Sequence, residues 1–333
     1  MTASPRCLNA AGKLLPAFAF LISMQAAHAQ SLRQALEVSL ATLSSKSHSA
    51  ILLWDLARGE ALAAVRVEVF TAPRCLGSLV KPFLLLAYLK EHCSDITFPP
   101  HEALACSSRA DASPVPQAGF ELRPCVGRAT SQCPVECWYK PGHGKLAMSR
   151  ALAVSCNQYF YQVSKRTSPP AFFRTLAALG LSASGDLASR APVAPETMIG
   201  LDSTLRLAPL QVLEAYGVLV SGHPSRETGT LATPAFAHAI LLDGLRLGPM
   251  EGTSALAQQA LPPNHPLLGK TGTSPAFAGK RYLKSRTDGW FLGFYPAAQP
   301  VLAVMVYYPG GLGARDAAPL GGQAIRMYLE MVR

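Results

Sequence analysis

The sequence predicts an α+β fold in which a mostly helical subdomain is inserted into one β-sheet. Strand-like apolar runs occur at 50–69 and again at 267–308, whereas the stretch between them carries helical patterns. Of the 333 residues, 49% are hydrophobic and 15% are charged, a composition that buries a core and excludes disorder. The length allows one large domain or two small ones.

Residues 1–29 have the layout of a secretory signal peptide. Two basic residues and no acidic residue precede or flank an apolar run over 14–24, and Ala29 stands at the expected cleavage point. The run is shorter than the ~20 residues that span a bilayer. We therefore expect export across the inner membrane and a soluble periplasmic or extracytoplasmic domain of residues 30–333, without a transmembrane segment.

The charge of the chain does not identify a partner. Thirty Lys and Arg against 20 Asp and Glu give a net charge of +10. The basic residues are scattered, whereas a nucleic-acid site gathers them in one patch, so we expect no nucleic-acid partner.

The first predicted elements are a helix and two strands. Ser31 and Gln34 form a capping box that begins a helix over 31–44, in which leucines recur at helical spacing. The apolar runs 50–54 and 61–69 predict two strands joined by a hairpin loop.

Helical patterns then fill the middle of the chain, and strands return near its end. The predicted helices cover 78–89, 148–166, 171–179 and 209–220. The later strands are predicted at 267–273, 290–295 and 301–308, followed by a closing helix over 322–333. The inserted helical subdomain should cover roughly 83–262.

Seven cysteines remain after the expected cleavage. They are Cys75, Cys93, Cys106, Cys125, Cys133, Cys137 and Cys156. An oxidising compartment favours disulfides among them, with the pairing undetermined and at least one thiol left free by the odd count. A zinc site is the alternative, but the C-x7-C-x3-C spacing from Cys125 lacks a paired C-x2-C knuckle.

The first motif with chemical meaning is Ser78-Leu79-Val80-Lys81. On a helix, Ser78 and Lys81 share one face. Pro82 limits where the helix can begin, because proline clashes with the carbonyl four residues earlier, and so places Ser78 at the N-terminus. A desolvated lysine can activate a serine nucleophile. Taken alone, the motif favours an ordinary N-cap serine beside a solvated lysine; the other motifs reverse that preference.

The second motif is Ser155-Cys156-Asn157. Its polar residues interrupt two apolar helical stretches, which predicts a turn that faces a cleft. Ser155 would relay a proton between Lys81 and a leaving group, and Asn157 would bind a substrate amide. Cys156 would point away and pack as a small apolar residue. An ordinary corner between helices is the alternative.

The third motif, Lys270-Thr271-Gly272-Thr273, ends a predicted strand. A substrate peptide can pair along such an edge, with Lys270 and Thr273 holding a carboxylate and Gly272 permitting close approach. The backbone N–H groups of Ser78 and Thr273 would form an oxyanion hole.

With these three motifs in this order, the sequence resembles the penicillin-recognising serine acyl-enzymes, most closely the transpeptidase domains of penicillin-binding proteins. The likeness extends over 77–89, 142–161, 199–216 and 288–296, and so over essentially the whole mature chain. It implies a five-stranded antiparallel sheet flanked by helices.

The resemblance also implies roles for the motif residues. Ser78 would be the acylated nucleophile, Lys81 its base, Ser155 the proton relay and Asn157 a substrate ligand. Lys270, Thr271, Gly272 and Thr273 would form the substrate-binding strand, and Lys270 would help to depress the pKa of Lys81. No metal or organic cofactor is implied.

Two segments depart from the family pattern. Cys75-Leu76-Gly77 replaces the usual Pro-Gly before the serine, and Leu201-Asp202 stands where Gln-Gly is common. The second departure puts substrate contacts in that segment in doubt.

Three functions follow from the resemblance. The first is a D,D-transpeptidase or D,D-carboxypeptidase that acts on peptidoglycan stem peptides and is inhibited covalently by β-lactams. A cell-wall synthesis protein would be a compatible partner for it. The second is a noncatalytic module that binds peptidoglycan or β-lactams. The third is a serine β-lactamase, which the absence of a loop Glu followed closely by Asn between Asn157 and Lys270 argues against.

Overall fold

The computed structural model describes residues 14–93, 125–131, 133–183, 187, 192–221, 235–278 and 281–332. The expectations for residues 1–13 and for Cys106 lie outside these residues.

The sheet has five strands, all antiparallel to their neighbours, in the order β2-β1-β5-β4-β3. The strands are β1 (Ala50–Asp55), β2 (Glu60–Val65), β3 (Leu268–Ala278), β4 (Arg281–Tyr295) and β5 (Leu302–Tyr308). This confirms the predicted sheet. The predicted strand 61–69 is too long, because Arg66 has a left-handed φ of 55° that ends β2.

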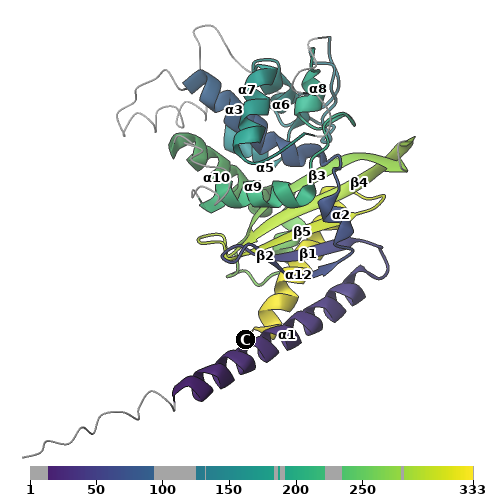
Figure 1. Ribbon diagram of the computed structural model, residues 1–333. Helices are drawn as coiled ribbons and strands as arrows, with labels where there is room; N and C mark the ends of the chain where they lie inside the picture. The colour runs from purple at the N-terminus through teal and green to yellow at the C-terminus, as the bar shows by residue number, and fades with distance from the viewer. Residues whose placement is uncertain are drawn as a thin grey trace, which may run out of the picture.

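Helices cover the sheet, and the described elements between β2 and β3 are helices (Figure 1). The longer ones are α1 (Leu14–Ser44), α3 (Lys81–Cys93), α6 (Asn157–Ser164), α7 (Pro169–Ala178), α9 (Pro209–Ser221), α10 (Ala235–Glu251) and α12 (Ala318–Met331). The shorter ones are α2 (Glu68–Thr71), the 3₁₀ turn η2 (Gly77–Val80), α5 (Met148–Ala153), α8 (Pro195–Met198), α11 (Ala255–Gln259) and the π-helical turn η3 (Gly313–Ala317).

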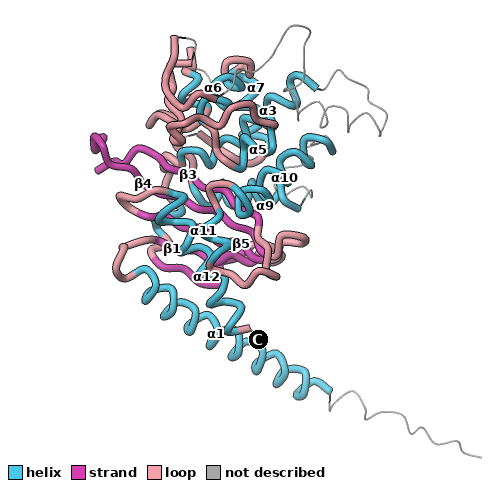
Figure 2. The backbone as a smooth tube through the Cα atoms, turned by 180° about the vertical axis from the view of Figure 1, so that it is seen from behind, coloured by secondary structure: helices cyan, strands magenta, loops and turns pink. Residues whose placement is uncertain are grey.

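The sheet separates two hydrophobic cores, because successive side chains of a strand point to opposite faces. In β1, Leu52 packs with the middle helices, whereas Ile51 and Leu53 belong to the opposite core. That second core is closed by α1, α11 and α12; in Figure 2, which shows the molecule from behind, α11 and α12 lie in front of the sheet and α1 runs below them. Apart from α11, the helices between β2 and β3 therefore pack on the first core, with β3 at the edge of the sheet nearest to them.

Two of the predicted helices differ most from the observed ones. The helix expected to begin at Ser31 begins at Leu14 instead, so the expected cleavage point after Ala29 lies within α1. The single helix predicted over 148–166 is two helices, α5 and α6, separated at Ser155 as the second motif indicated. Among the described residues, no helix combines the length and apolarity needed to cross a bilayer.

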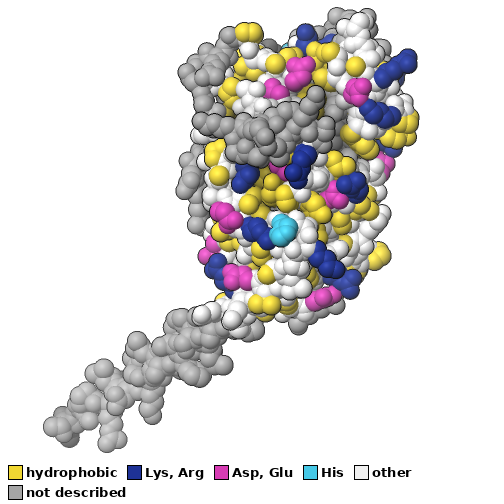
Figure 3. All heavy atoms as spheres, turned by 90° about the vertical axis from the view of Figure 1, so that its right-hand side faces the viewer, with side chains coloured by type: hydrophobic (Ala, Val, Ile, Leu, Met, Phe, Trp, Pro, Cys, Tyr) yellow, Lys and Arg dark blue, Asp and Glu magenta, His cyan; other side chains and the backbone are white. Residues whose placement is uncertain are grey.

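The surface charge is mixed. On the face shown in Figure 3, Lys and Arg side chains are interspersed with Asp and Glu, and hydrophobic side chains lie between them. This face therefore carries no continuous basic surface of the kind that binds nucleic acid.

Candidate active site

Ser78 lies in a 3₁₀ turn that leads into α3. The turn covers Gly77–Val80, and the α-helix begins at Lys81, three residues later than predicted. Pro82 is tolerated because it occupies the first turn of α3, where an N–H group has no helical partner. In a 3₁₀ turn, side chains three apart eclipse each other, so the turn still directs Ser78 and Lys81 to one side.

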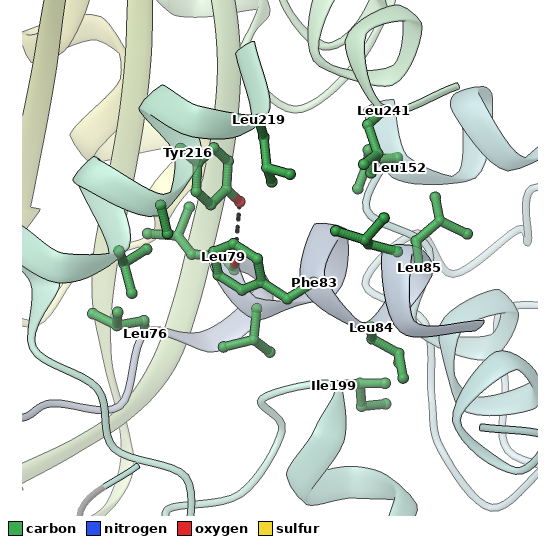
Figure 4. Packing of buried hydrophobic residues seen from close by; sticks show 14 of the residues in the cluster. Leu76, Leu79, Phe83, Leu84, Leu85, Leu152, Ile199, Tyr216, Leu219 and Leu241 are labelled. Atoms are coloured by element: carbon green, nitrogen blue, oxygen red, sulfur yellow. Dashed lines mark hydrogen bonds between the residues drawn. The ribbon is translucent and has the colours of Figure 1, made fainter. Parts of the chain in front are cut away.

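Buried side chains hold this turn in place (Figure 4). The hydroxyl of Tyr216 in α9 donates a hydrogen bond of 2.7 Å to the carbonyl of Leu79. The ring of Tyr216 also meets Phe83 edge-on, with centroids 5.3 Å apart. Leu79 and Phe83 are fully buried. Ser78 itself is half-buried, so its hydroxyl stands at the border of a rigid core.

The amine of Lys81 is fully buried and points toward the second motif. It donates hydrogen bonds to the carbonyl of Ser155 at 2.9 Å and to Oδ1 of Asn157 at 2.8 Å, and it lies 3.5 Å from the hydroxyl of Ser155. Within the described residues, no hydrogen bond joins the hydroxyl of Ser78 to Lys81. Such bonds often tighten only when substrate binds.

Ser155 joins the two buried lysines. Its hydroxyl accepts a hydrogen bond of 2.8 Å from Lys270 in β3, and Lys81 approaches it from α3. The backbone of Ser155 has a φ of 53°, a left-handed conformation that serine rarely adopts. Because both lysines approach the oxygen, the hydrogen of the hydroxyl remains available for donation to a substrate.

Burial changes the protonation of both lysines. Desolvation lowers the pKa of Lys81 to about 8. Desolvation, and after it the positive charge of Lys81, lowers the pKa of Lys270 well below its usual range. Lys81 is therefore partly neutral near neutral pH, which is the form that accepts a proton.

The side-chain amide of Asn157 has a fixed orientation. Its Oδ1 accepts from Lys81, and its Nδ2 donates a hydrogen bond of 3.1 Å to the carbonyl of Glu136. Glu136 lies in the segment 125–144 that precedes α5, so this segment takes part in positioning the second motif. This contact could not be predicted from the sequence, because it joins a backbone carbonyl to a side chain 21 residues away.

Strand β3 passes directly against the turn that carries Ser78. Gly77 has a φ of 57°, and a Cβ there would lie 2.2 Å from the carbonyl oxygen of Thr273. A Cβ on Gly272 would lie 2.3 Å from the carbonyl oxygen of Leu76. Two glycines therefore permit the approach of the two backbones that would bring the N–H groups of Ser78 and Thr273 to one substrate oxygen.

The threonines of the third motif differ in their contacts. Thr271 is buried, and its hydroxyl forms a hydrogen bond of 2.6 Å with the hydroxyl of Thr253. Thr273 is half-buried and accepts from the N–H of Gly313 at 3.0 Å. Thr271 is thus engaged in packing between β3 and the end of α10, while Thr273 stands nearer to the exposed edge.

The two segments that depart from the family pattern, Cys75-Leu76-Gly77 and Leu201-Asp202, lie close together. The thiol of Cys75 donates to the carbonyl of Ser203 at 3.4 Å. Asp202 accepts from the hydroxyl of Thr197 and from the N–H of Thr204, so its carboxylate stabilises its own loop. The segment around Leu201-Asp202 therefore supports the loop before Ser78.

The expected disulfides are wrong for the cysteines whose thiols are described. Cys75, Cys125, Cys133, Cys137 and Cys156 are all free and buried. Cys156 is more than a small packing residue, because its sulfur accepts from the N–H of Tyr159 at the start of α6 and lies 3.8 Å from the sulfur of Cys137.

Comparison with protein families decides the classification. The family model described as the penicillin-binding protein transpeptidase domain matches residues 126–326, more than half of the chain. The chain belongs to this family. The matched residues of this transpeptidase-family chain include the second and third motifs, whereas the turn that carries Ser78 precedes the match. No curated protein matches the chain.

Solved structures of penicillin-binding proteins share the fold of this transpeptidase-family chain. The transpeptidase domain of penicillin-binding protein 3 from Burkholderia pseudomallei has a TM-score of 0.67 at 18% identity, over 91% of this chain and 95% of that one. The transpeptidase domain of the FtsI4 D,D-transpeptidase from Legionella pneumophila gives 0.62 at 16%, over 90% and 96%. Penicillin-binding protein 2 of Helicobacter pylori, in complex with MreC, gives 0.64 at 19%, over 89% and 63%.

Proposed function

We propose that this protein is an exported serine D,D-transpeptidase or D,D-carboxypeptidase that cleaves the D-Ala-D-Ala bond of peptidoglycan stem peptides through an acyl-enzyme on Ser78. The observation that carries the proposal is the pair of buried amines, Lys81 and Lys270, that converge on the hydroxyl of Ser155 next to the turn with Ser78. A site that only binds ligand has no use for a desolvated base.

The first step forms an ester on Ser78. Its hydroxyl oxygen attacks the carbonyl carbon of the penultimate D-Ala, and its proton passes to the neutral amine of Lys81. When the C–N bond breaks, the departing nitrogen takes up a proton through the hydroxyl of Ser155, and D-Ala leaves. An amine or water then attacks the ester and restores the hydroxyl.

The backbone and the edge strand supply the rest of the site. Negative charge on the carbonyl oxygen would be stabilised by the N–H groups of Ser78 and Thr273. The substrate peptide would lie along β3, which pairs with β4 on one side only. Lys270 with Thr273 would bind the terminal carboxylate, and Asn157 a substrate amide.

The proposal is tested by incubating the purified protein with benzylpenicillin and measuring its intact mass. Opening of the β-lactam ring releases no leaving group, so we expect one adduct with the mass of the whole drug, and peptide mapping should place it on Ser78. An unmodified protein with intact drug would favour the noncatalytic module instead. An unmodified protein with hydrolysed drug would indicate a β-lactamase.

A stem-peptide assay separates the two proposed activities. We expect release of D-Ala from a peptide that ends in D-Ala-D-Ala. A cross-linked product in the presence of an acceptor amine indicates transpeptidation, and hydrolysis alone indicates carboxypeptidation. The complex of the Helicobacter pylori relative with MreC supports the idea that a cell-wall synthesis protein also binds this chain.

The rate of acylation should depend on pH through Lys81. Because burial lowers its pKa to about 8, the neutral base becomes more abundant as pH rises. Lys270 faces the same hydroxyl, but burial and the charge of Lys81 hold the pKa of Lys270 well below its usual range. We expect the second-order rate constant for a fluorescent penicillin to fall about tenfold per unit below pH 7 and to level off above about 8. A flat profile over this range would contradict the role of Lys81.

A further inference from the structure

Four side chains outside the reacting groups converge on one point behind the second motif. The sulfur atoms of Cys125, Cys137 and Cys156 and Nδ1 of His143 all lie within 4.8 Å of one another. The three thiols are buried and the imidazole is half-buried. We propose that these four side chains bind one Zn²⁺ ion in a structural Cys₃His site.

The spacing of the donor atoms fits a tetrahedral ion. With Zn–S bonds of about 2.3 Å and Zn–N bonds of about 2.0 Å, tetrahedral geometry puts sulfurs about 3.8 Å apart and sulfur and nitrogen about 3.5 Å apart. Cys137 and Cys156 have their sulfurs 3.8 Å apart. Nδ1 of His143 lies 3.5 Å from Cys125 and 3.4 Å from Cys137. A disulfide instead needs sulfurs about 2.0 Å apart.

Backbone hydrogen bonds hold the ligand-bearing segment in this shape. Cys125 and Gly144 exchange two of them, at 2.8 and 3.0 Å, and the N–H of Cys137 donates to the carbonyl of Gly127 at 2.8 Å. These bonds close the segment 125–144 into a compact loop. Two cysteines and the histidine are thereby preorganised around a shared centre.

A buried glutamine fastens this loop to α6, which carries the fourth ligand at its N-cap. The side chain of Gln158 accepts from the N–H of Val126 at 2.8 Å and donates to the carbonyls of Arg128 and Val135 at 2.6 and 3.1 Å. Cys156 lies two residues before Gln158. The loop and the start of α6 are therefore joined around the four donors by contacts that do not depend on a metal.

Aromatic rings cover the histidine ligand. The rings of Trp138 and Tyr139 lie 5.4 and 5.1 Å from the ring of His143, centroid to centroid. The indole N–H of Trp138 donates to the carbonyl of Val154 at 2.8 Å, which attaches this cover to the end of α5. With four protein donors and a covered histidine, the centre has the closed coordination of structural zinc and no open position for catalysis.

The site would also position the second motif, an inference that rests on the proposed function. Cys156 stands between Ser155 and Asn157, and Cys137 follows Glu136, whose carbonyl fixes the amide of Asn157. A metal bound to both cysteines would hold the loop against the turn. Loss of the metal should therefore slow acylation without removing any group that touches substrate.

Metal content tests the proposal directly. After dialysis against Zn²⁺ and removal of free ion, we expect about one zinc per chain by elemental mass spectrometry. Replacement by Co²⁺ should give the intense visible absorption of a tetrahedral cobalt thiolate. The variants Cys125→Ser and His143→Ala should lose the metal. Cys133→Ser is the matched control, because it removes a buried free thiol of the same loop that lies outside the cluster, and it should keep the metal.

Three outcomes would overturn the proposal. One is a folded wild-type protein without stoichiometric metal, and another is equal metal loss in the control variant. The third is a denatured, unreduced protein in which iodoacetamide fails to reach Cys137 and Cys156, since that result shows a disulfide. These readouts need no penicillin, so failure of the proposed function leaves them interpretable.

The positioning role has its own readout. We expect His143→Ala to acylate about 10- to 100-fold more slowly than Cys133→Ser, because small displacements of aligned groups carry large rate costs. Equal rates in the two variants would overturn the link between the metal and the second motif.

Discussion

Replacement of Lys81 by methionine should slow acylation by benzylpenicillin about 10²- to 10⁴-fold, the range over which a positioned general base acts. Methionine preserves the length of the side chain in a fully buried site but cannot take the proton of Ser78. The second-order rate constant, measured by quenched-flow mass spectrometry, reports this loss. Methionine fills the same volume but leaves the carbonyl of Ser155 and Oδ1 of Asn157 without this donor, so we expect a folded protein that has lost about 1–3 kcal/mol per unpaired acceptor.

The matched control for this variant is Lys46→Met. Lys46 is exposed in the turn that follows α1, so its replacement removes one lysine at a distance from the site. Its acylation rate should equal that of the wild type. A Lys81→Met protein that acylates within about threefold of the wild type would show that another group is the base.

Replacement of Gly77 by alanine should destabilise the protein by about 3–5 kcal/mol and abolish rapid acylation, because strain and overpacking act together. The added Cβ would lie 2.2 Å from the carbonyl oxygen of Thr273 and 2.8 Å from its nitrogen, so β3 and the turn with Ser78 would have to separate. Urea unfolding measures the first effect and the benzylpenicillin adduct the second.

Gly59→Ala isolates the conformational part of this effect. Gly59 has a similar φ of 67°, but nothing lies within 4 Å of the position of its Cβ. This control should cost only about 1–2 kcal/mol and should leave acylation unchanged. If both variants lose the same free energy of unfolding, the close approach of the two backbones at Gly77 does not contribute to the effect.

The parts of the fold that follow local rules were predictable. The strands and most helices of the described residues occur where apolar periodicity indicated, and Ser155 does separate two helices. Helix α10 was missed because it contains Gly244, Gly248 and Pro249, which lower helix propensity. Its stability comes from packing instead, since a Cβ on Gly244 would lie 2.7 Å from Leu152.

The metal-binding cluster was beyond the reach of sequence spacing. Its ligands are 12, 6 and 13 residues apart along the chain, at 125, 137, 143 and 156, and none of them forms a short paired knuckle. Spacing along the chain relates only the cysteines of one segment to each other. It could not show that Cys156, assigned to the second motif, faces the same point as two cysteines and a histidine from the preceding loop.

The left-handed backbone of Ser155 lowers the free energy of unfolding of this protein, because a side chain is strained at that φ. Glycine would adopt a φ of 53° without the steric strain that a Cβ brings. Glycine has no hydroxyl to place between Lys81 and Lys270. If Ser155 relays the proton as proposed, Ser155→Gly should relieve the backbone strain and abolish rapid acylation together.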